Sequence, residues 1–199
     1  MVKRLSFYLL GLWIATLGIG LCIQSGWGTG SLEAAFVGAN NQFPLTVGTW
    51  SILIQIVMVA FAAWMNKKRP AYESAIAVII RGVMLDFWLV GIFPHLSFQM
   101  DWESRLLLFG FGVFCLGFGV GMYLIPKLPK TPLDTMITAL EERYGWSMHR
   151  SRLAVQVTFI LIALCLAGPV GIGTLGVTLM MSPIASHSFH LLEKVYERM

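Results

Sequence analysis

Residues 5–24 read LSFYLLGLWIATLGIGLCIQ, an apolar run that carries no charged side chain. A helix that crosses the hydrocarbon core of a bilayer needs about 20 mostly apolar residues, because each residue adds about 1.5 Å. The run is longer than the ~7–15-residue apolar core of a secretory signal peptide, and no A-x-A-like cleavage site follows it. We therefore expect a retained transmembrane helix at the start of the chain.

Five further stretches have a similar length and apolar character, and each predicts a spanning helix: 46–65, 73–94, 104–125, 153–167 and 171–190. Only residues 168–170 separate the last two, so one long broken helix is the alternative there. Hydrophobic residues make up 57% of the 199-residue chain and charged residues 12%, against about 45–50% and about 25% in soluble domains. This composition excludes a soluble or a disordered chain. We expect a single all-α membrane domain over 1–199, with about six helices and no separate soluble domain.

The lysine and arginine residues orient these spans. Of the 14, all but Arg81 and Arg105 fall in segments on the same side as the N-terminus if there are six spans. Because cytoplasmic loops carry the excess of basic residues, we expect both termini in the cytoplasm. The net charge of +4 then reflects contact with the lipid bilayer and gives no argument for nucleic acid. The segment 188–199 has an amphipathic pattern and is predicted to lie on the inner membrane surface.

The two halves of the chain, about 5–94 and 104–190, repeat the same order of features. The matching segments are 17–20 (LGIG) with 116–119 (LGFG), 32–33 (LE) with 133–134 (LD), and 54–56 (IQI) with 155–157 (VQV). Each half contains three predicted spans, so the second half enters the membrane upside down. This inverted-repeat plan is common in secondary transporters, whose sites lie near the midplane where the repeats meet, and it also occurs in channels.

A short helix is predicted after the first span of the second half. Thr131 is suited to cap it, Pro132 to its first turn, and Asp134 completes an acidic capping pattern. Gly145 is a plausible stop. This helix lies at the inner surface or dips into the membrane.

The corresponding segment of the first half is less regular. Ser31 is a candidate cap, Glu33 follows in the first turn, and Gly38 with the asparagines behind it is predicted to end the helix. The segment 26–41 either folds back into the membrane as a half-helix or lies on its surface. Glu33 and Asp134 accordingly either cap interfacial helices or line a solute path.

Arg81 and Asp86 lie inside the third predicted span. A charge at that depth costs at least ~2.5–3.5 kcal/mol on insertion scales, so a partner, water or a ligand must compensate it. Five positions on a helix correspond to about 140° around the axis, so the two side chains do not face each other. The functional hypothesis is that Arg81 attracts an anion and Asp86 binds a proton or cation. The alternative is that both lock helices together through polar contacts.

These features resemble the YczE-like family of predicted bacterial integral membrane proteins. The resemblance rests on the glycine-rich first span, the Pro–apolar–acidic helix start, and the charged third span with Gly82 and Asp86. The chain departs from the pattern at Gly30-Ser31, where a proline-containing pair is expected. The resemblance implies a multi-pass protein of the bacterial inner membrane and supplies no settled activity.

Three further polar residues are candidates for a substrate or ion path. Gln55 and Gln156 occupy matching places in the second and fifth spans, and His187 falls at the repeat position of Asp86. Hydrogen bonds between helices are the simpler explanation of the two glutamines. An interfacial histidine explains His187, because the residue is close to the predicted helix end.

The glycines of the first and fourth spans are predicted to pack helices closely: Gly18, Gly20, Gly117, Gly119 and Gly121. The three cysteines are far apart in sequence and show no metal-ligand spacing. We expect no metal and no cofactor.

The leading functional hypothesis is a small secondary transporter. It would move an anionic or zwitterionic solute across the membrane through a path that lies between the two repeats. The alternative is a non-transporting scaffold, or a solute-binding subunit of a larger membrane complex. The sequence lacks H-E-x-x-H and G-x-S-x-G motifs and does not favour an enzyme. A homo-oligomer and a membrane partner protein are both compatible with the pattern.

Overall fold

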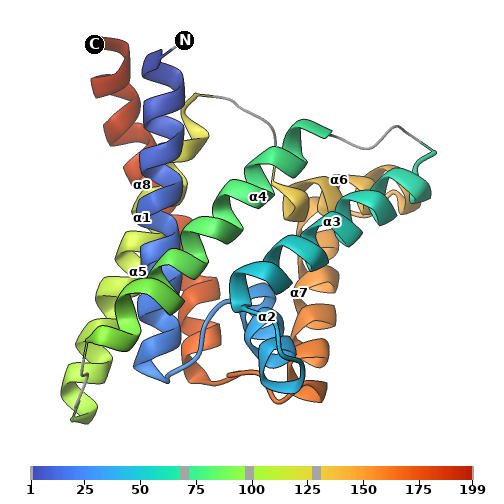
Figure 1. The fold of residues 1–199 in the computed structure, drawn as a ribbon. Helices are drawn as coiled ribbons and strands as arrows, with labels where there is room; N and C mark the ends of the chain where they lie inside the picture. The colour runs from blue at the N-terminus through green and yellow to red at the C-terminus, as the bar shows by residue number, and fades with distance from the viewer. Residues whose placement is uncertain (1, 68–71, 97–100, 127–130, 199) are drawn as a thin grey trace. The chain divides into compact units, whose positions relative to one another are not determined.

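The computed structural model describes residues 2–67, 72–96, 101–126 and 131–198, and these are helical apart from short connections. Figure 1 shows the helices in chain order. They are α1 (Val2–Ser25), α2 (Ser31–Gln42), α3 (Val47–Met65), α4 (Tyr72–Asp86), the π-helix η1 (Phe87–Ile92), the 3-10 turn η2 (Phe93–His95), α5 (Trp102–Leu124), α6 (Pro132–Tyr144), α7 (Met148–Cys165) and α8 (Ile172–Arg198). The all-α class predicted from the sequence is confirmed.

Five helical segments within the described residues are long and apolar enough to cross a membrane: Lys3–Ser25, Val47–Met65, Ser74–His95, Trp102–Leu124 and Met148–Cys165. They coincide with the first five predicted spans. The third is continuous through α4, η1 and η2. Large apolar side chains such as Leu107 and Val57 stay exposed on these helices, as expected of surfaces that face lipid.

The sixth predicted span lies in α8, which is not among these five. Serine and histidine residues interrupt its apolar run and lower its mean hydropathy. The helix nevertheless runs the full length of α1. Its first turn lies beside the end of α1, where the Gly173 amide donates to the Trp27 carbonyl at 3.0 Å, and its last turn lies beside Lys3, which bonds the Tyr196 carbonyl. α8 is thus long enough to reach both ends of α1 within unit 1.

The two ends of α8 can be compared with the predicted boundaries. Most of the predicted amphipathic tail, 188–198, forms the last turns of α8, which continues unbroken through Arg198, and its place on the inner membrane surface stays a prediction. The ring of Phe7 packs edge-on against Tyr196, 5.1 Å between centroids, and Lys3 lies over the same ring. The predicted break at 168–170 is present between α7 and α8.

The helices form two compact units, and each takes helices from both halves of the chain. Unit 1 comprises Met1–Gly30, Met84–Leu128 and Pro169–Met199; unit 2 comprises Ser31–Val83 and Pro129–Gly168. In unit 1, α1 packs along α5, and α5 packs along α8.

Glycines bring α1 and α5 into backbone contact. A methyl group added at Gly18 would lie 2.3 Å from the Leu116 amide nitrogen, and one at Gly119 would lie 2.4 Å from the Ala15 amide nitrogen. Neither site has room for a side chain. The other three predicted packing glycines face other neighbours in unit 1: Gly20 meets Phe93, Gly117 meets Ile184, and Gly121 meets the Ala185 carbonyl.

In unit 2, each short helix packs against the C-terminal end of a spanning helix. α2 packs on α7, where a methyl group at Gly38 would lie 2.9 Å from Leu166 Cβ. Gly38 therefore lies inside α2 and does not end it, contrary to expectation, because this contact needs a residue without a side chain. α6 packs on α3 through Ala139 and Met65.

Hydrogen bonds repeat at corresponding places in unit 2. The Asn41 amide donates to the Ala167 carbonyl at 3.1 Å beyond α7, and the Asn66 amide donates to Glu142 at 2.7 Å beyond α3. Thr46 caps α3 by accepting from the Thr49 amide, as Ser147 caps α7 by accepting from the Arg150 amide.

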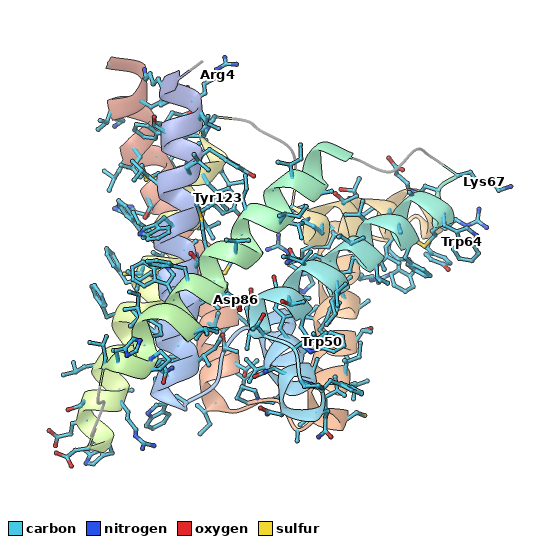
Figure 2. All side chains as sticks on the ribbon, viewed as in Figure 1. Arg4, Trp50, Trp64, Lys67, Asp86 and Tyr123 are labelled. Carbon is cyan, nitrogen blue, oxygen red and sulfur yellow. The ribbon has the colours of Figure 1, made fainter. Side chains whose placement is uncertain are left out.

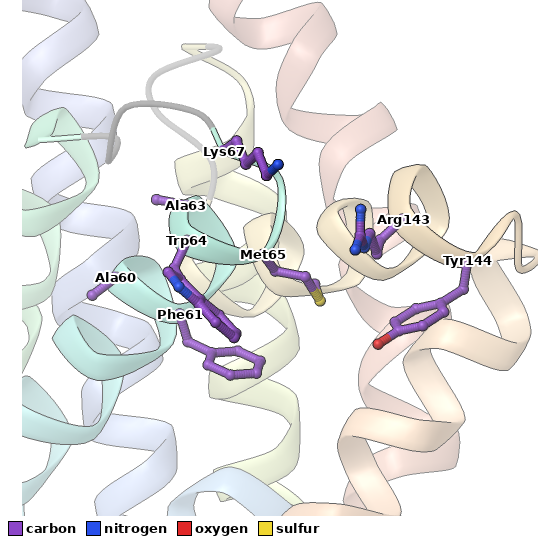
Figure 3. Close-up of a pocket in the computed structure, with 8 residues that line it drawn as sticks. All are labelled: Ala60, Phe61, Ala63, Trp64, Met65, Lys67, Arg143 and Tyr144. Atoms are coloured by element: carbon purple, nitrogen blue, oxygen red, sulfur yellow. The ribbon is translucent and has the colours of Figure 1, made fainter.

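The C-terminal ends of α3 and α6 border a pocket of about 610 Å³. Figure 3 shows its lining, with aromatic rings and two basic side chains around the opening. Trp64 and Lys67, at this end of α3, project away from the ribbon in Figure 2.

Candidate functional site

A charged pair lies inside unit 2. Nη2 of Arg81, on α4, donates to Oε1 of Glu33, on α2, at 2.9 Å. The side chains are only 19% and 13% exposed. Water has little access to either side chain, so each charge is compensated by the other. A buried charge is costly unless it is paired in this way.

The pair lies well inside a candidate span. Arg81 is seven residues after Ser74 and fourteen before His95, which corresponds to roughly 10 Å and 20 Å along the helix. The first turn of α2, which carries Glu33, lies at the same level as Arg81. This contact favours the re-entrant alternative for residues 26–41 over a helix on the membrane surface. Glu33 also lies at the helix N-terminus, whose partial positive charge favours a carboxylate.

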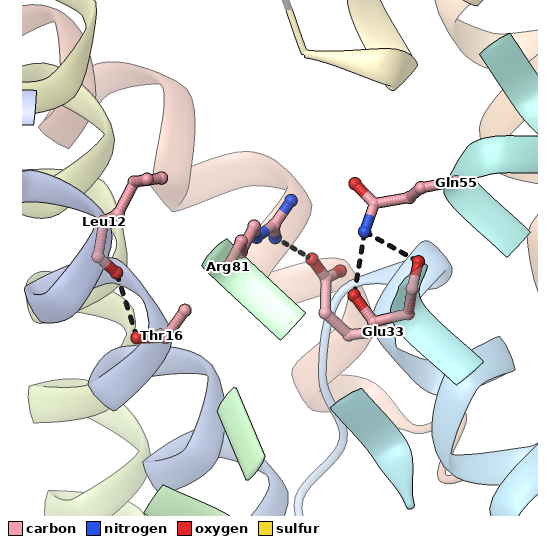
Figure 4. Close-up of polar contacts among 6 residues, drawn as sticks. Leu12, Thr16, Glu33, Gln55 and Arg81 are labelled. Atoms are coloured by element: carbon pink, nitrogen blue, oxygen red, sulfur yellow. Dashed lines mark hydrogen bonds and ion pairs between the residues drawn. The ribbon is translucent and has the colours of Figure 1, made fainter. Parts of the chain in front are cut away.

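Gln55 contributes buried polar groups from α3 in the same unit. Its side-chain amide donates to the Ser51 carbonyl at 2.9 Å and to the Ser51 hydroxyl at 2.8 Å, and both residues are about 1% exposed. Figure 4 shows these bonds together with the Arg81–Glu33 pair. These hydrogen bonds of Gln55 lie within its own helix. They differ from the hydrogen bond between helices that was the alternative expected from the sequence.

A close crossing holds α4 against α3 next to Arg81. A methyl group at Gly82 would lie 2.4 Å from the Ile52 side chain and 2.8 Å from the Gly48 carbonyl. Gly82 thereby sets the distance between the helix that carries Arg81 and the helix that carries Gln55. We call Glu33, Ser51, Gln55 and Arg81 the polar cluster of unit 2.

Asp86 and Arg81 do not pair with each other. This agrees with their helical spacing, which places the two side chains on different faces of the helix. Asp86 is half-buried at the end of α4, in the part of that helix that belongs to unit 1 (Figure 2). The π-helix η1 begins directly after it. Trp13 of α1 packs against both aromatic rings there. Its ring centroid lies 4.9 Å from that of Phe87 and 5.0 Å from that of Trp88. Short π-helical stretches are frequent at functional sites.

The remaining predicted site residues do not join the polar cluster. Asp134 accepts from the Thr131 hydroxyl at 2.8 Å while its own amide donates to that hydroxyl, so it serves as part of a helix cap. Gln156 is partly exposed on α7, unlike the buried Gln55. His187 is exposed on α8 in unit 1.

Sequence reasoning found both members of the ion pair but missed their pairing. It predicted that Glu33 caps a helix or lines a solute path, and that Arg81 attracts an anion. It gave Ser51 no role. The available signal was charge balance, because an intramembrane arginine needs an acidic partner and Glu33 follows an uncharged glycine-rich segment. In the part of the chain that the structure describes, no group of three or more His, Cys, Asp and Glu residues could hold a metal ion.

Comparison with known proteins identifies a family and several relatives. Residues 2–188 match the family of unknown function DUF6198. The uncharacterized protein YyaS of Bacillus subtilis (strain 168) is 33% identical over 186 residues, which cover 94% of this chain and 92% of the relative. The uncharacterized membrane protein YczE of the same organism is 31% identical over 176 residues, covering 88% and 80%.

A more distant relative is an uncharacterized protein of Haemophilus influenzae (strain ATCC 51907 / DSM 11121 / KW20 / Rd), 25% identical over 86% of this chain and 77% of the relative. No solved structure matches the chain. The resemblance to YczE-like membrane proteins noted from the sequence is confirmed. The chain is a membrane protein with several apolar helices, and it belongs to the family of unknown function DUF6198.

Proposed function

We propose that this protein is a small secondary transporter for an anionic or zwitterionic solute, and that the polar cluster of unit 2 binds this solute. The observation that carries the proposal is the Arg81–Glu33 pair, held at 2.9 Å inside a candidate span. Ionisable residues inside spanning segments are costly and mark substrate or ion paths by default. The proposal includes no enzymatic reaction.

The charges of the pair match those of a zwitterion. A solute carboxylate would take the place of Glu33 on Arg81, and a solute ammonium would bind the released Glu33 carboxylate. Each charge would exchange one partner for another, so no bare charge is left in the membrane during binding. The guanidinium is suited to a carboxylate because its fork donates two parallel hydrogen bonds.

The repeated contacts of unit 2 support an inverted repeat. α2 packs on the end of α7 as α6 packs on the end of α3, and the Asn41–Ala167 bond corresponds to the Asn66–Glu142 bond. Two equivalent halves offer two arrangements of similar energy, which alternating access requires. The acidic positions differ between the halves, because Glu33 binds Arg81 whereas Asp134 caps its helix.

The remaining parts of the proposal follow the sequence pattern. Asp86, half-buried beside the π-helix, would carry the coupling proton. The distribution of basic residues orients the protein with both termini in the cytoplasm of a bacterium, in the inner membrane.

Counterflow in proteoliposomes tests the proposal for several classes of solute at once. Vesicles loaded with unlabelled amino acids, lactate, succinate and phosphate are diluted into trace amounts of each labelled compound. We expect the full-length protein to accumulate at least one label above protein-free vesicles. Arg81→Gln and Glu33→Gln should abolish this accumulation. Arg105→Gln and Glu103→Gln make the same changes at exposed positions on α5 and should not.

Two results would overturn the proposal. Accumulation that is unchanged in Arg81→Gln and Glu33→Gln removes the polar cluster from the solute path. No accumulation of any panel compound by folded protein rejects transport of this class of solute. A stoichiometric partner that co-purifies from native membrane would then identify the scaffold or binding-subunit alternative.

A further inference from the structure

The pocket between α3 and α6 combines an apolar wall with two positive charges. Its apolar lining includes Phe61, Trp64 and Met65 of α3 and Tyr144 of α6, and its charges are Lys67 and Arg143. Figure 3 shows both basic side chains directed toward the gap between the two helices, with the Tyr144 ring facing Met65 and Phe61 across it. The pocket lies wholly within unit 2 and is separate from the polar cluster.

The walls of this pocket are held in place. Ala62 and Met65 of α3 form a buried cluster with Ala139 of α6. The Asn66 amide donates to the Glu142 carboxylate at 2.7 Å across the same pair of helices. The pocket is therefore a feature of the packed fold, built where two helix ends meet.

The two cations have no acidic partner among the residues that the structure describes. Among the described carboxylates, none lies within ion-pair distance of Lys67 or Arg143. Glu142, the neighbour of Arg143, is directed to Asn66. Lys67 also holds a left-handed backbone conformation, with φ of 52°, in the turn that ends α3. Non-glycine residues rarely adopt it, so the fold keeps this lysine at the turn against a conformational preference.

The pocket lies at the end of a candidate span, where the polar headgroups of a bilayer are expected. α3 is a candidate span that ends at Met65, and Lys67 follows two residues later. Trp64 is 75% exposed and Tyr144 is 58% exposed at the same place. Tryptophan and tyrosine are enriched where a membrane meets water, and basic pockets on the cytoplasmic side bind anionic headgroups.

We propose that this pocket binds the headgroup of an anionic phospholipid, such as phosphatidylglycerol. Lys67 and Arg143 bind the phosphate, and the glycerol and upper acyl carbons lie against Trp64, Phe61 and Tyr144. The phosphate group is the chemistry that the two cations recognise. The exposed aromatic wall selects a lipid over a free anion, because a soluble phosphate leaves that apolar surface in water.

Native mass spectrometry of the full-length protein tests this site. The protein in detergent is mixed with equimolar phosphatidylglycerol and phosphatidylcholine of identical acyl chains. We expect retained phosphatidylglycerol adducts in preference to phosphatidylcholine. The double variant Lys67→Gln/Arg143→Gln should lose phosphatidylglycerol affinity by about tenfold, because each basic residue near the headgroups contributes. The control Arg150→Gln/Lys194→Gln removes the same charge at exposed positions and should keep the preference.

A second pair of variants separates the aromatic contribution from the charges. Trp64→Ala should lower phosphatidylglycerol binding about threefold or more, as the loss of one interfacial aromatic side chain predicts. Trp102→Ala removes a comparably exposed tryptophan on α5, 65% against 75% exposed, and should have no effect. Circular dichroism of each variant reports that the helices are retained.

Three outcomes would overturn the lipid assignment. Equal retention of the two lipids by the wild-type protein contradicts headgroup recognition. Unchanged phosphatidylglycerol binding in the Lys67/Arg143 double variant contradicts this location. Displacement of the lipid by glycerol 3-phosphate at equal concentration identifies a soluble phosphate as the ligand, because the acyl chains then add nothing.

Discussion

Nη2 of Arg81 lies 2.9 Å from Oε1 of Glu33, although 48 positions separate the two residues in the chain. One belongs to a spanning helix and the other to the first turn of a short helix. The contact ties the start of α2 to the interior of α4 in unit 2. It is the relationship on which the proposed solute site depends.

Removing both members of this pair should cost less stability than the sum of the two single removals. Arg81→Gln or Glu33→Gln leaves a partly buried charge without its partner, and we expect each to cost about 2–4 kcal/mol of unfolding free energy. In the double variant the stranded charge is gone, so its cost should be smaller than the sum of the single costs. Unfolding of each variant in mixed micelles gives the four free energies. Additive single costs would show that the two side chains do not interact.

The contact between α1 and α5 should not tolerate a methyl group at Gly18. Gly18→Ala places Cβ 2.3 Å from the Leu116 amide nitrogen, so the two helices must move apart. We expect a loss of about 1–3 kcal/mol, as in other overpacked cores. Gly110→Ala is the control on α5, because a Cβ there has no neighbour within 4 Å and alanine favours the helix. Melting temperatures in detergent should fall for the first variant and stay or rise for the second.

Water access should differ between positions 85 and 86. Leu85 is 1% exposed, whereas Asp86 is half-buried at the start of the π-helix. After the three native cysteines are replaced, single cysteines at these positions are treated with a membrane-impermeant thiol reagent from each side. We expect Asp86→Cys to react and Leu85→Cys to be protected. Reaction of position 86 from both sides would support a water-filled path.

An unreactive cysteine at position 86, in protein that is folded, would make Asp86 a packing residue. Its proposed role as the carrier of a coupling proton would then be withdrawn. Reaction from one side alone would indicate a vestibule, as in a solute-binding subunit.

Both termini should lie on one side of the membrane. Lys3 of α1 contacts Tyr196 of α8, so the two ends of the chain meet in unit 1. Reporter fusions that fluoresce only in the cytoplasm should be active at either end, since basic residues favour the cytoplasmic side. A fusion that is active at one end alone would contradict the predicted sixth crossing by α8. A control fusion inserted between the third and fourth predicted spans, a segment predicted to be outside, should be dark.

Much of the fold follows from local sequence. The apolar runs predict the first five spans, because every spanning segment must bury its backbone polar groups in a helix and cover them with apolar side chains. The cap at Thr131 and the stop at Gly145 were also predictable, since an N-cap hydroxyl and a left-handed glycine act within one turn. The polar residues of α8 lower its mean hydropathy below that of the five candidate spans, so local sequence indicates this helix less clearly. Its length is seen in the structure, where its last turn contacts the start of α1.

The sequence by itself determined that this is an all-α membrane protein and which residues carry charge inside it. Only the tertiary structure decided that Arg81 meets Glu33, that Asp134 serves as a cap, and that Gly38 lies inside α2. The physical reason is that helical periodicity specifies which residues share a face of one helix. Which other helix lies opposite that face depends on packing between segments far apart in the chain, such as the close approach of Gly82 to Gly48 beside Arg81.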